Sequence, residues 1–92
     1  MISEKDRSAI VELAGRYGAH RVLAFGSGAD SSIEGRDIDV AVEGVPQSEF
    51  FSFFGDLIFG VSKPVDLIDL SSDSAFTRMV RREGITLYDR TQ

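Results

Sequence analysis

The segment from Asp37 to Glu43 is the feature that most constrains how this chain can fold. Its residues alternate between two sets: Ile38, Val40 and Val42 at one parity, and Asp37, Asp39 and Ala41 at the other. Because successive side chains of a strand point to opposite faces of a sheet, this pattern predicts a strand with one apolar face and one acidic face. The apolar face needs a hydrophobic core, and the acidic face needs solvent or a ligand.

The rest of the chain alternates between helical and strand patterns. A first helix is expected from an N-cap at Ser3, with Asp6 completing a capping box, to a stop at Gly18. A last helix is expected from a cap at Asp73 to Gly84. The remaining elements are a loop with one helical turn at 28–36, a helix at 47–59, and strands at 21–25, 37–43, 65–70 and 85–88. This order predicts a single α/β domain over residues 1–92, with helices layered on a small sheet.

Composition excludes several classes of protein. The chain has 92 residues, a net charge of −5 and no cysteine. Such a charge opposes loose binding to nucleic-acid phosphates, and the lack of cysteine excludes a disulfide scaffold and a thiolate zinc site. No apolar run is long enough to span a bilayer, so we expect a cytoplasmic protein without a membrane partner.

The two acids Asp37 and Asp39 indicate metal binding. Two residues apart on one strand face, they lie roughly 6.6–6.8 Å from each other along the backbone. Carboxylates this close raise each other's pKa unless a cation lies between them, and Mg²⁺ prefers carboxylate oxygens. Asp66, in the next strand, is the candidate third acid, because Asp69 points to the opposite face of that strand.

A glycine-serine turn follows the first strand. At Gly26 and Ser27 the backbone N–H groups become free, and the serine hydroxyl can also donate, so the turn is a candidate phosphate site. Each piece alone has a plainer interpretation as a turn or an exposed strand charge. The ordered combination of strand, Gly-Ser, Asp-x-Asp strand, helix and Asp-containing strand is much more specific.

At these motifs the chain resembles the DNA polymerase β-like nucleotidyltransferase superfamily, and within it the minimal nucleotidyltransferases of the MNT antitoxin type. The resemblance rests on 25–27 (Phe-Gly-Ser), 36–40 (Arg-Asp-Ile-Asp-Val), 64–68 (Pro-Val-Asp-Leu-Ile) and 82–88. It implies a mixed sheet of about four strands, two Mg²⁺ ions and ATP as substrate. It also implies transfer of AMP to a hydroxyl, with tyrosine expected, on a HEPN-domain toxin. Asp37, Asp39 and Asp66 would be the catalytic and metal-binding residues, and Gly26 and Ser27 would bind the nucleotide.

The chain also departs from the family pattern. The loop between the two motifs is one residue shorter than usual, and Asp30-Ser31 occupies the place of a common Arg-Gly pair. Arg36 is the candidate cation for nucleotide binding in its place, and Lys63 is a second one. The alternative hypothesis is a catalytically weak or inactive binding module that neutralises a HEPN partner by contact. A small-molecule acceptor is a third hypothesis, but it would require further substrate-binding structure.

The helix at 47–59 carries more aromatic residues than one buried stripe can hold. Phe50, Phe51, Phe53 and Phe54 cover more than one side of the helix, so some of them should be exposed and form a protein interface. Association between copies of the chain is left open. The arginines 78, 81 and 82 are expected to form a solvated helix face.

Overall fold

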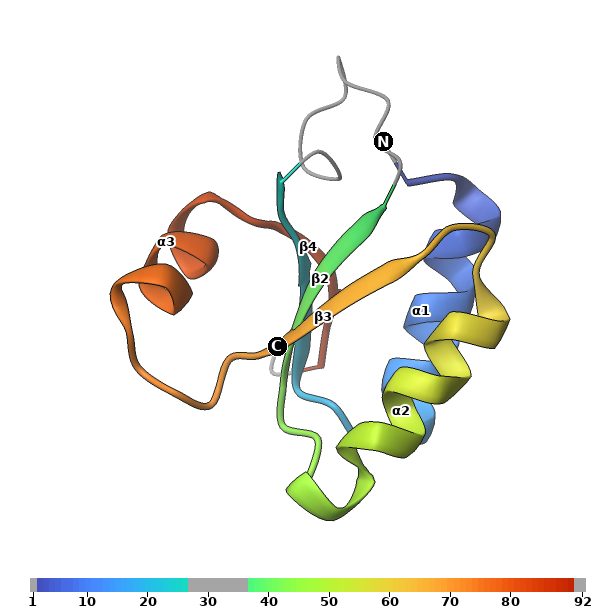
Figure 1. The fold of residues 1–92 in the computed structure, drawn as a ribbon, viewed down its shortest axis with the longest axis horizontal. Helices are drawn as coiled ribbons and strands as arrows, with labels where there is room; N and C mark the ends of the chain where they lie inside the picture. Colours follow the sequence, from blue (N-terminus) through green and yellow to red (C-terminus); the bar gives the residue numbers. More distant parts are fainter. Residues whose placement is uncertain (1, 27–36, 91–92) are drawn as a thin grey trace.

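The computed structural model describes residues 2–26 and 37–90, and in these ranges the chain forms its elements in the predicted order (Figure 1). The elements are α1 (Glu4–Arg16), β1 (Arg21–Ala24), β2 (Ile38–Glu43), α2 (Gln47–Gly60), β3 (Val65–Asp69), α3 (Ala75–Glu83) and β4 (Ile85–Asp89). The helical turn predicted within 28–36 falls outside the described residues. None of the helices in the described ranges is long and apolar enough to cross a membrane.

The four strands form one mixed sheet in the order β3-β2-β1-β4. Strand β1 is antiparallel to both β2 and β4, whereas β2 and β3 are parallel. Two parallel neighbours need a crossover connection, and α2 supplies it between β2 and β3. The mixed sheet that the family resemblance implied is therefore confirmed.

Two apolar clusters lie on opposite faces of this sheet. Figure 1 shows α1 and α2 on one side of the strands and α3 on the other. The larger cluster joins Ile10, Leu13, Phe53 and Leu57 of the first two helices to Ile38, Val40, Val42 and Val65 of the sheet. The smaller one joins Leu23, Ala41, Leu70 and Val80 beneath α3. The alternation predicted for β2 is confirmed, since Ile38, Val40 and Val42 enter the larger cluster and Ala41 enters the smaller one.

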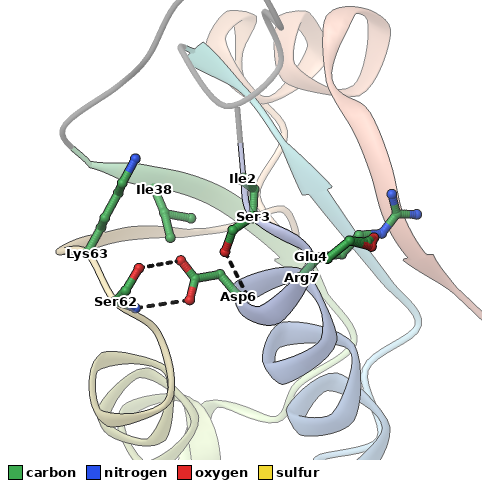
Figure 2. A pocket seen from close by; sticks show the side chains of 8 residues that line it. All are labelled: Ile2, Ser3, Glu4, Asp6, Arg7, Ile38, Ser62 and Lys63. Carbon is green, nitrogen blue, oxygen red and sulfur yellow. Dashed lines mark hydrogen bonds between the residues drawn. The ribbon is translucent and has the colours of Figure 1, made fainter.

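The N-terminus of α1 is capped as predicted, but Asp6 has another role. Ser3 accepts a hydrogen bond from the Asp6 backbone N–H at 3.1 Å. The Asp6 carboxylate does not complete a capping box; it accepts from the Ser62 backbone N–H at 3.0 Å and the Ser62 hydroxyl at 2.7 Å (Figure 2). Asp6 is only 3% exposed. It therefore fixes the start of α1 to the connection between α2 and β3.

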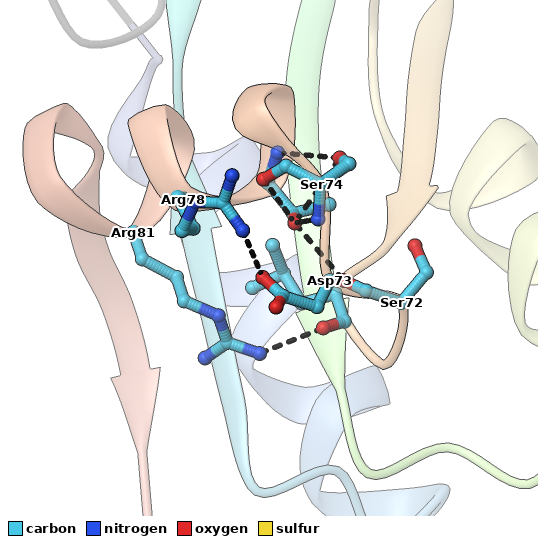
Figure 3. A network of polar contacts seen from close by, with 7 residues as sticks. Ser72, Asp73, Ser74, Arg78 and Arg81 are labelled. Carbon is cyan, nitrogen blue, oxygen red and sulfur yellow. Dashed lines mark hydrogen bonds and ion pairs between the residues drawn. The ribbon is translucent and has the colours of Figure 1, made fainter.

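The N-cap of α3 is Ser74, and the prediction of Asp73 was wrong by one residue. Ser74 accepts from the Thr77 backbone N–H at 3.1 Å, and the Ser74 N–H donates to the Thr77 hydroxyl at 2.9 Å (Figure 3). Asp73 instead pairs with Arg78 at 2.8 Å on the surface. The reciprocal hydrogen bonds between Ser74 and Thr77 already cap the N-terminus of α3. Asp73 is therefore not needed as a cap and pairs with Arg78. Gly84 ends the helix as predicted.

Arg81 lies on the exposed side of α3 with Arg78 and Arg82, as expected, but its side chain also contacts the sheet. Its guanidinium pairs with Glu43 at 2.6 Å. It also donates to the Leu70 carbonyl oxygen at 2.7 Å, a bond that Figure 3 shows. Glu43 ends β2 and Leu70 follows β3. Arg81 thus holds α3 against the far ends of the two parallel strands.

The Asp6–Ser62 contact should be a major stabilising interaction between α1 and the rest of the fold. Replacing Asp6 with alanine leaves two donors without their acceptor, and we expect a loss of about 1–3 kcal/mol in unfolding free energy. The matched control is Glu4→Ala, an exposed acid in the same helical turn, with an expected change of about 0.5 kcal/mol or less. Urea denaturation measures both. Equal losses in the two variants would contradict this role of Asp6.

Candidate functional site

The pairing of β2 with β3 brings Asp39 and Asp66 together. In the parallel register Asp39 lies directly opposite Asp66, between the pairs Ile38–Val65 and Val40–Leu67. Neighbouring strands are about 4.8 Å apart, and residues opposite each other point to the same face. The two carboxylates therefore lie side by side on the α3 face of the sheet. The preference for Asp66 over Asp69, based on strand parity, agrees with this geometry.

Gly26 lies against the Asp39 carboxylate at the end of β1. Its φ of +60° lies in the left-handed region, and a Cβ at this position would be 2.5 Å from Asp39 Oδ2. The neighbouring Phe25 backbone N–H donates to the Asp39 carbonyl oxygen at 3.0 Å. Only glycine allows the chain to approach the acid this closely while turning in this direction. The first half of the Gly-Ser turn is thus adjacent to the acidic pair.

The environment of Asp39 opposes its negative charge. Burial raises the pKa of the Asp39 carboxyl above its ordinary value of 3.8, and the charges of Asp66 and Asp37 raise it further. A hydrogen bond between the side chains of Asp39 and Asp66 contributes in the same direction. Like charges at short range hinder each other's ionisation. A cation at this position would remove both the repulsion and the desolvation cost.

The other predicted site residues have different positions. Asp37 is exposed and lies one residue before β2, so the strand begins later than predicted. Ser27 and Arg36 lie outside the described residues. Asp69 is at the opposite end of β3, where it accepts from the Ser71 backbone N–H at 2.9 Å and from the Gln47 side chain at 3.4 Å.

No group of three or more acids and histidines within residues 2–26 and 37–90 is arranged to hold a metal ion. The adjoining pair Asp39 and Asp66 nevertheless offers the oxygen ligands that Mg²⁺ prefers. The raised pKa of Asp39 indicates an excess of negative charge that a divalent cation would neutralise. Two of the three predicted acids therefore fit a metal site together, and Asp37 is close enough to act on Asp39 electrostatically.

An apolar hollow of about 400 Å³ opens beside Gly26 on the α3 face. Phe25 and Phe76 line it and contact each other edge to face, with ring centroids 5.8 Å apart. Phe76 remains 47% exposed although it belongs to the apolar side of α3. The helical pattern after Asp73 predicts Phe76 in the core, and the hollow was not predicted from the sequence. The sequence signal for the hollow was Phe25, an aromatic residue directly before the glycine turn.

A larger hollow of about 470 Å³ lies at the N-terminus of α1 (Figure 2). Its walls include Asp6, Ile38, Ser62 and Lys63. Ile38 belongs to the core on the α1 and α2 side of the sheet, so this hollow and the Asp39 carboxylate are on different faces. Its acid, Asp6, is already bonded to Ser62. Lys63, the second candidate phosphate cation, is half-buried at this hollow.

Comparison with known proteins finds likeness at the level of structure. No protein-family model and no curated protein sequence matches the chain. A crystal structure of a toxin-antitoxin with AMP-PNP aligns with a TM-score of 0.74 and 24% identity, over 94% of this chain and 75% of that one. The MntA-HepT toxin-antitoxin gives 0.72 and 22%, over 98% and 75%. A tri-AMPylated Shewanella oneidensis HEPN toxin in complex with MNT antitoxin gives 0.70 and 24%, over 95% and 72%.

These alignments establish that the chain has the fold of the matched chains. They cover nearly all of the chain and about three quarters of each matched chain. The predicted fold class, a small mixed sheet with helices packed on it, is therefore confirmed.

We expect Asp39→Asn to stabilise the metal-free protein at neutral pH. A raised pKa means that the folded state binds this proton more tightly than the unfolded chain does, so stability falls as pH rises from 3.8 through the raised pKa. The cost is therefore larger at pH 7 than at pH 3, where the carboxyl is mostly protonated in both states. The melting temperature of the variant should exceed that of the wild type at pH 7 and match it at pH 3.

Mg²⁺ supplies the second arm of this experiment. It should raise the melting temperature of the wild type at pH 7 and leave that of Asp39→Asn unchanged. The control variant is Asp73→Asn, which removes an acid from an exposed ion pair and should respond to Mg²⁺ like the wild type. A stabilising effect of Mg²⁺ that persists in Asp39→Asn would place the ion elsewhere.

Gly26→Ala should be more damaging than an alanine at another glycine. The added Cβ would meet Asp39 Oδ2 in a backbone conformation that alanine rarely adopts, and we expect a cost of about 1–3 kcal/mol. Gly15→Ala, in the exposed interior of α1, is the control and should stabilise by about 0.5–1 kcal/mol. Chemical denaturation compares them, and a neutral Gly26→Ala would show that the turn tolerates a side chain.

Proposed function

We propose that the protein is a Mg²⁺-dependent nucleotidyltransferase that transfers AMP from ATP to a hydroxyl, with tyrosine expected, of a HEPN-domain toxin and thereby acts as its antitoxin. The observation that carries the proposal is the in-register pair Asp39 and Asp66, with Gly26 directly against Asp39. Acids on adjacent parallel strands beside a glycine turn are suited to phosphoryl-transfer chemistry. The enzyme would be a protein adenylyltransferase that releases pyrophosphate.

Each residue has a specific role in this proposal. Asp39 and Asp66, with Asp37, would hold two Mg²⁺ ions, which when bound neutralise negative charge on the phosphates and the carboxylates. Asp66 would also accept the proton of the attacking hydroxyl. Gly26 and Ser27 would donate backbone N–H groups to phosphate oxygens, and Arg36 would add a positive charge.

The neighbouring structures support the same reading. One of them contains AMP-PNP, and another contains an AMPylated HEPN toxin with its MNT antitoxin. The hollow lined by Phe25 and Phe76 adds support from this chain itself, because it offers aromatic surface for an adenine ring next to the glycine turn.

The decisive experiment weighs the toxin after incubation. A HEPN protein encoded beside this chain is mixed with ATP, Mg²⁺ and the antitoxin, and intact-mass spectrometry should detect AMP-sized increments on it. Asp39→Asn and Asp66→Asn should each slow the transfer by about 100-fold or more, since each removes a group that acts on the reacting atoms. The matched control is Asp69→Asn, which removes an acid from the other end of β3 and should keep the wild-type rate.

The second candidate function is neutralisation by contact alone. It is favoured by the shortened loop and by Asp30-Ser31, which stands in the place of the common Arg-Gly pair. The double variant Asp39→Asn/Asp66→Asn would then still rescue cells from the toxin, and the toxin would gain no mass. If the double variant binds the toxin but fails to rescue, AMP transfer is required and contact is insufficient.

A further inference from the structure

The outward side of α2 carries the two most exposed large hydrophobic side chains among the described residues. Phe51 is 82% exposed and Phe59 is 92% exposed, whereas Phe53 and Leu57 on the inward side are fully buried. Two phenylalanine rings in water are costly, since burying one contributes roughly 1.5–3 kcal/mol. Phe51 contacts Phe50 edge to face, with ring centroids 6.3 Å apart, but most of both exposed rings faces water. A surface that covers them is therefore the physical explanation to seek.

Phe51, Gly55 and Phe59 occupy one ridge of the helix. They follow one another at intervals of four residues, which places them on the same side, with each ring about 6 Å along the axis from the glycine. A Cβ at Gly55 would meet no atom within 4 Å. The ridge therefore has a large ring at each end and a low centre that opens to solvent.

We propose that this ridge, Phe51–Gly55–Phe59, is the contact of a symmetric dimer with a second copy of the chain. A two-fold axis through Gly55 places Phe51 of one copy against Phe59 of the other, and the reverse contact follows from the symmetry. The glycine at the axis allows the two antiparallel helices to approach closely. Because the spacing is equal on both sides of Gly55, the ridge is complementary to itself.

The charges near the ridge agree with this occupant. Within α2 the acids are Glu49 and Asp56, and the helix carries no basic residue. Asp56 is engaged, since it accepts a hydrogen bond from the Tyr17 hydroxyl at 2.6 Å. The ridge itself is uncharged. Two copies of a chain with a net charge of −5 can therefore meet there without repulsion between like charges at the centre. A basic partner would find no acid on the ridge to recognise.

The available area indicates a weak dimer. A phenylalanine buries about 150–250 Å², so the four rings of two copies account for roughly 600–1,000 Å². Stable interfaces bury about 1,200–2,000 Å², and transient ones bury less. We therefore expect a dissociation constant in the micromolar range or above, measurable by sedimentation at increasing protein concentration.

The dimer would leave Asp39 and Asp66 accessible. Dimerisation is a property separate from the proposed function. The α2 helix covers the sheet face opposite α3, whereas Asp39 and Asp66 lie on the α3 face (Figure 1). Dimerisation would thus present two sites on the outside of one particle.

A charge exchange at the axis tests this arrangement. Only a residue on a two-fold axis meets its own copy, so Gly55→Glu and Gly55→Lys should each be monomeric, with association weakened at least tenfold. An equimolar mixture of the two variants should restore the dimer, because unlike charges then meet at the axis. Since a Cβ at Gly55 would meet no atom within 4 Å beyond its own helical turn, both variants should fold, and circular dichroism verifies that they do.

Variants of the rings give an independent readout. Phe51→Ala and Phe59→Ala should each weaken association at least tenfold, because each ring occurs twice in the contact. The matched control is Phe76→Ala, an exposed aromatic residue on α3, which should leave association unchanged. A wild-type protein that stays monomeric at millimolar concentration overturns the proposal. A mixture of the charged variants that fails to associate also overturns it. If the same variants fail to bind a HEPN protein as well, that protein and not a second copy covers the ridge.

Discussion

The parallel pairing of β2 with β3 is the interaction on which the rest of this structure depends. It places Asp39 opposite Asp66, and it requires the crossover helix α2 to cover one face of the sheet. A slip of one residue between the two strands would turn Asp66 into the core beside Val40 and expose Leu67. The register is therefore fixed by apolar burial, and the position of the acids follows from it.

Strand β2 carries both an acid that lowers the stability of the fold and the apolar packing that offsets this loss. Ile38, Val40 and Val42 are 2%, 0% and 1% exposed, and each contributes roughly 1.5–3 kcal/mol through its burial. Asp39, between them in sequence, opposes folding at neutral pH because burial and neighbouring charges disfavour its ionised form. A central strand can carry such an unfavourable group, since its other face and both of its edges are satisfied. An edge strand has less to offset the repulsion.

Much of this fold follows from sequence pattern, because the deciding interactions are periodic. The alternation at 37–43 predicted two faces for β2, and parity alone separated Asp66 from Asp69. Two contacts that were not predicted depend on partners far away in the chain. Asp6 bonds to Ser62, and Arg81 bonds to Glu43, and neither spacing has a local signature. Of the site itself, sequence supplied the acids and Gly26 but not the Phe25–Phe76 hollow, which arises from tertiary packing.

The exposure of the acids has a consequence for the proposed activity. Asp66 and Asp37 are exposed and Asp39 is half-buried, so water has access to the place where charge would develop. Electrostatic interactions gain strength when water is excluded, and in this structure an acceptor protein is the natural means of exclusion. An acceptor surface that covers Asp39 and Asp66 would strengthen each charge interaction at the moment of transfer. Catalysis would then be coupled to binding of the correct partner, and free ATP alone would react slowly.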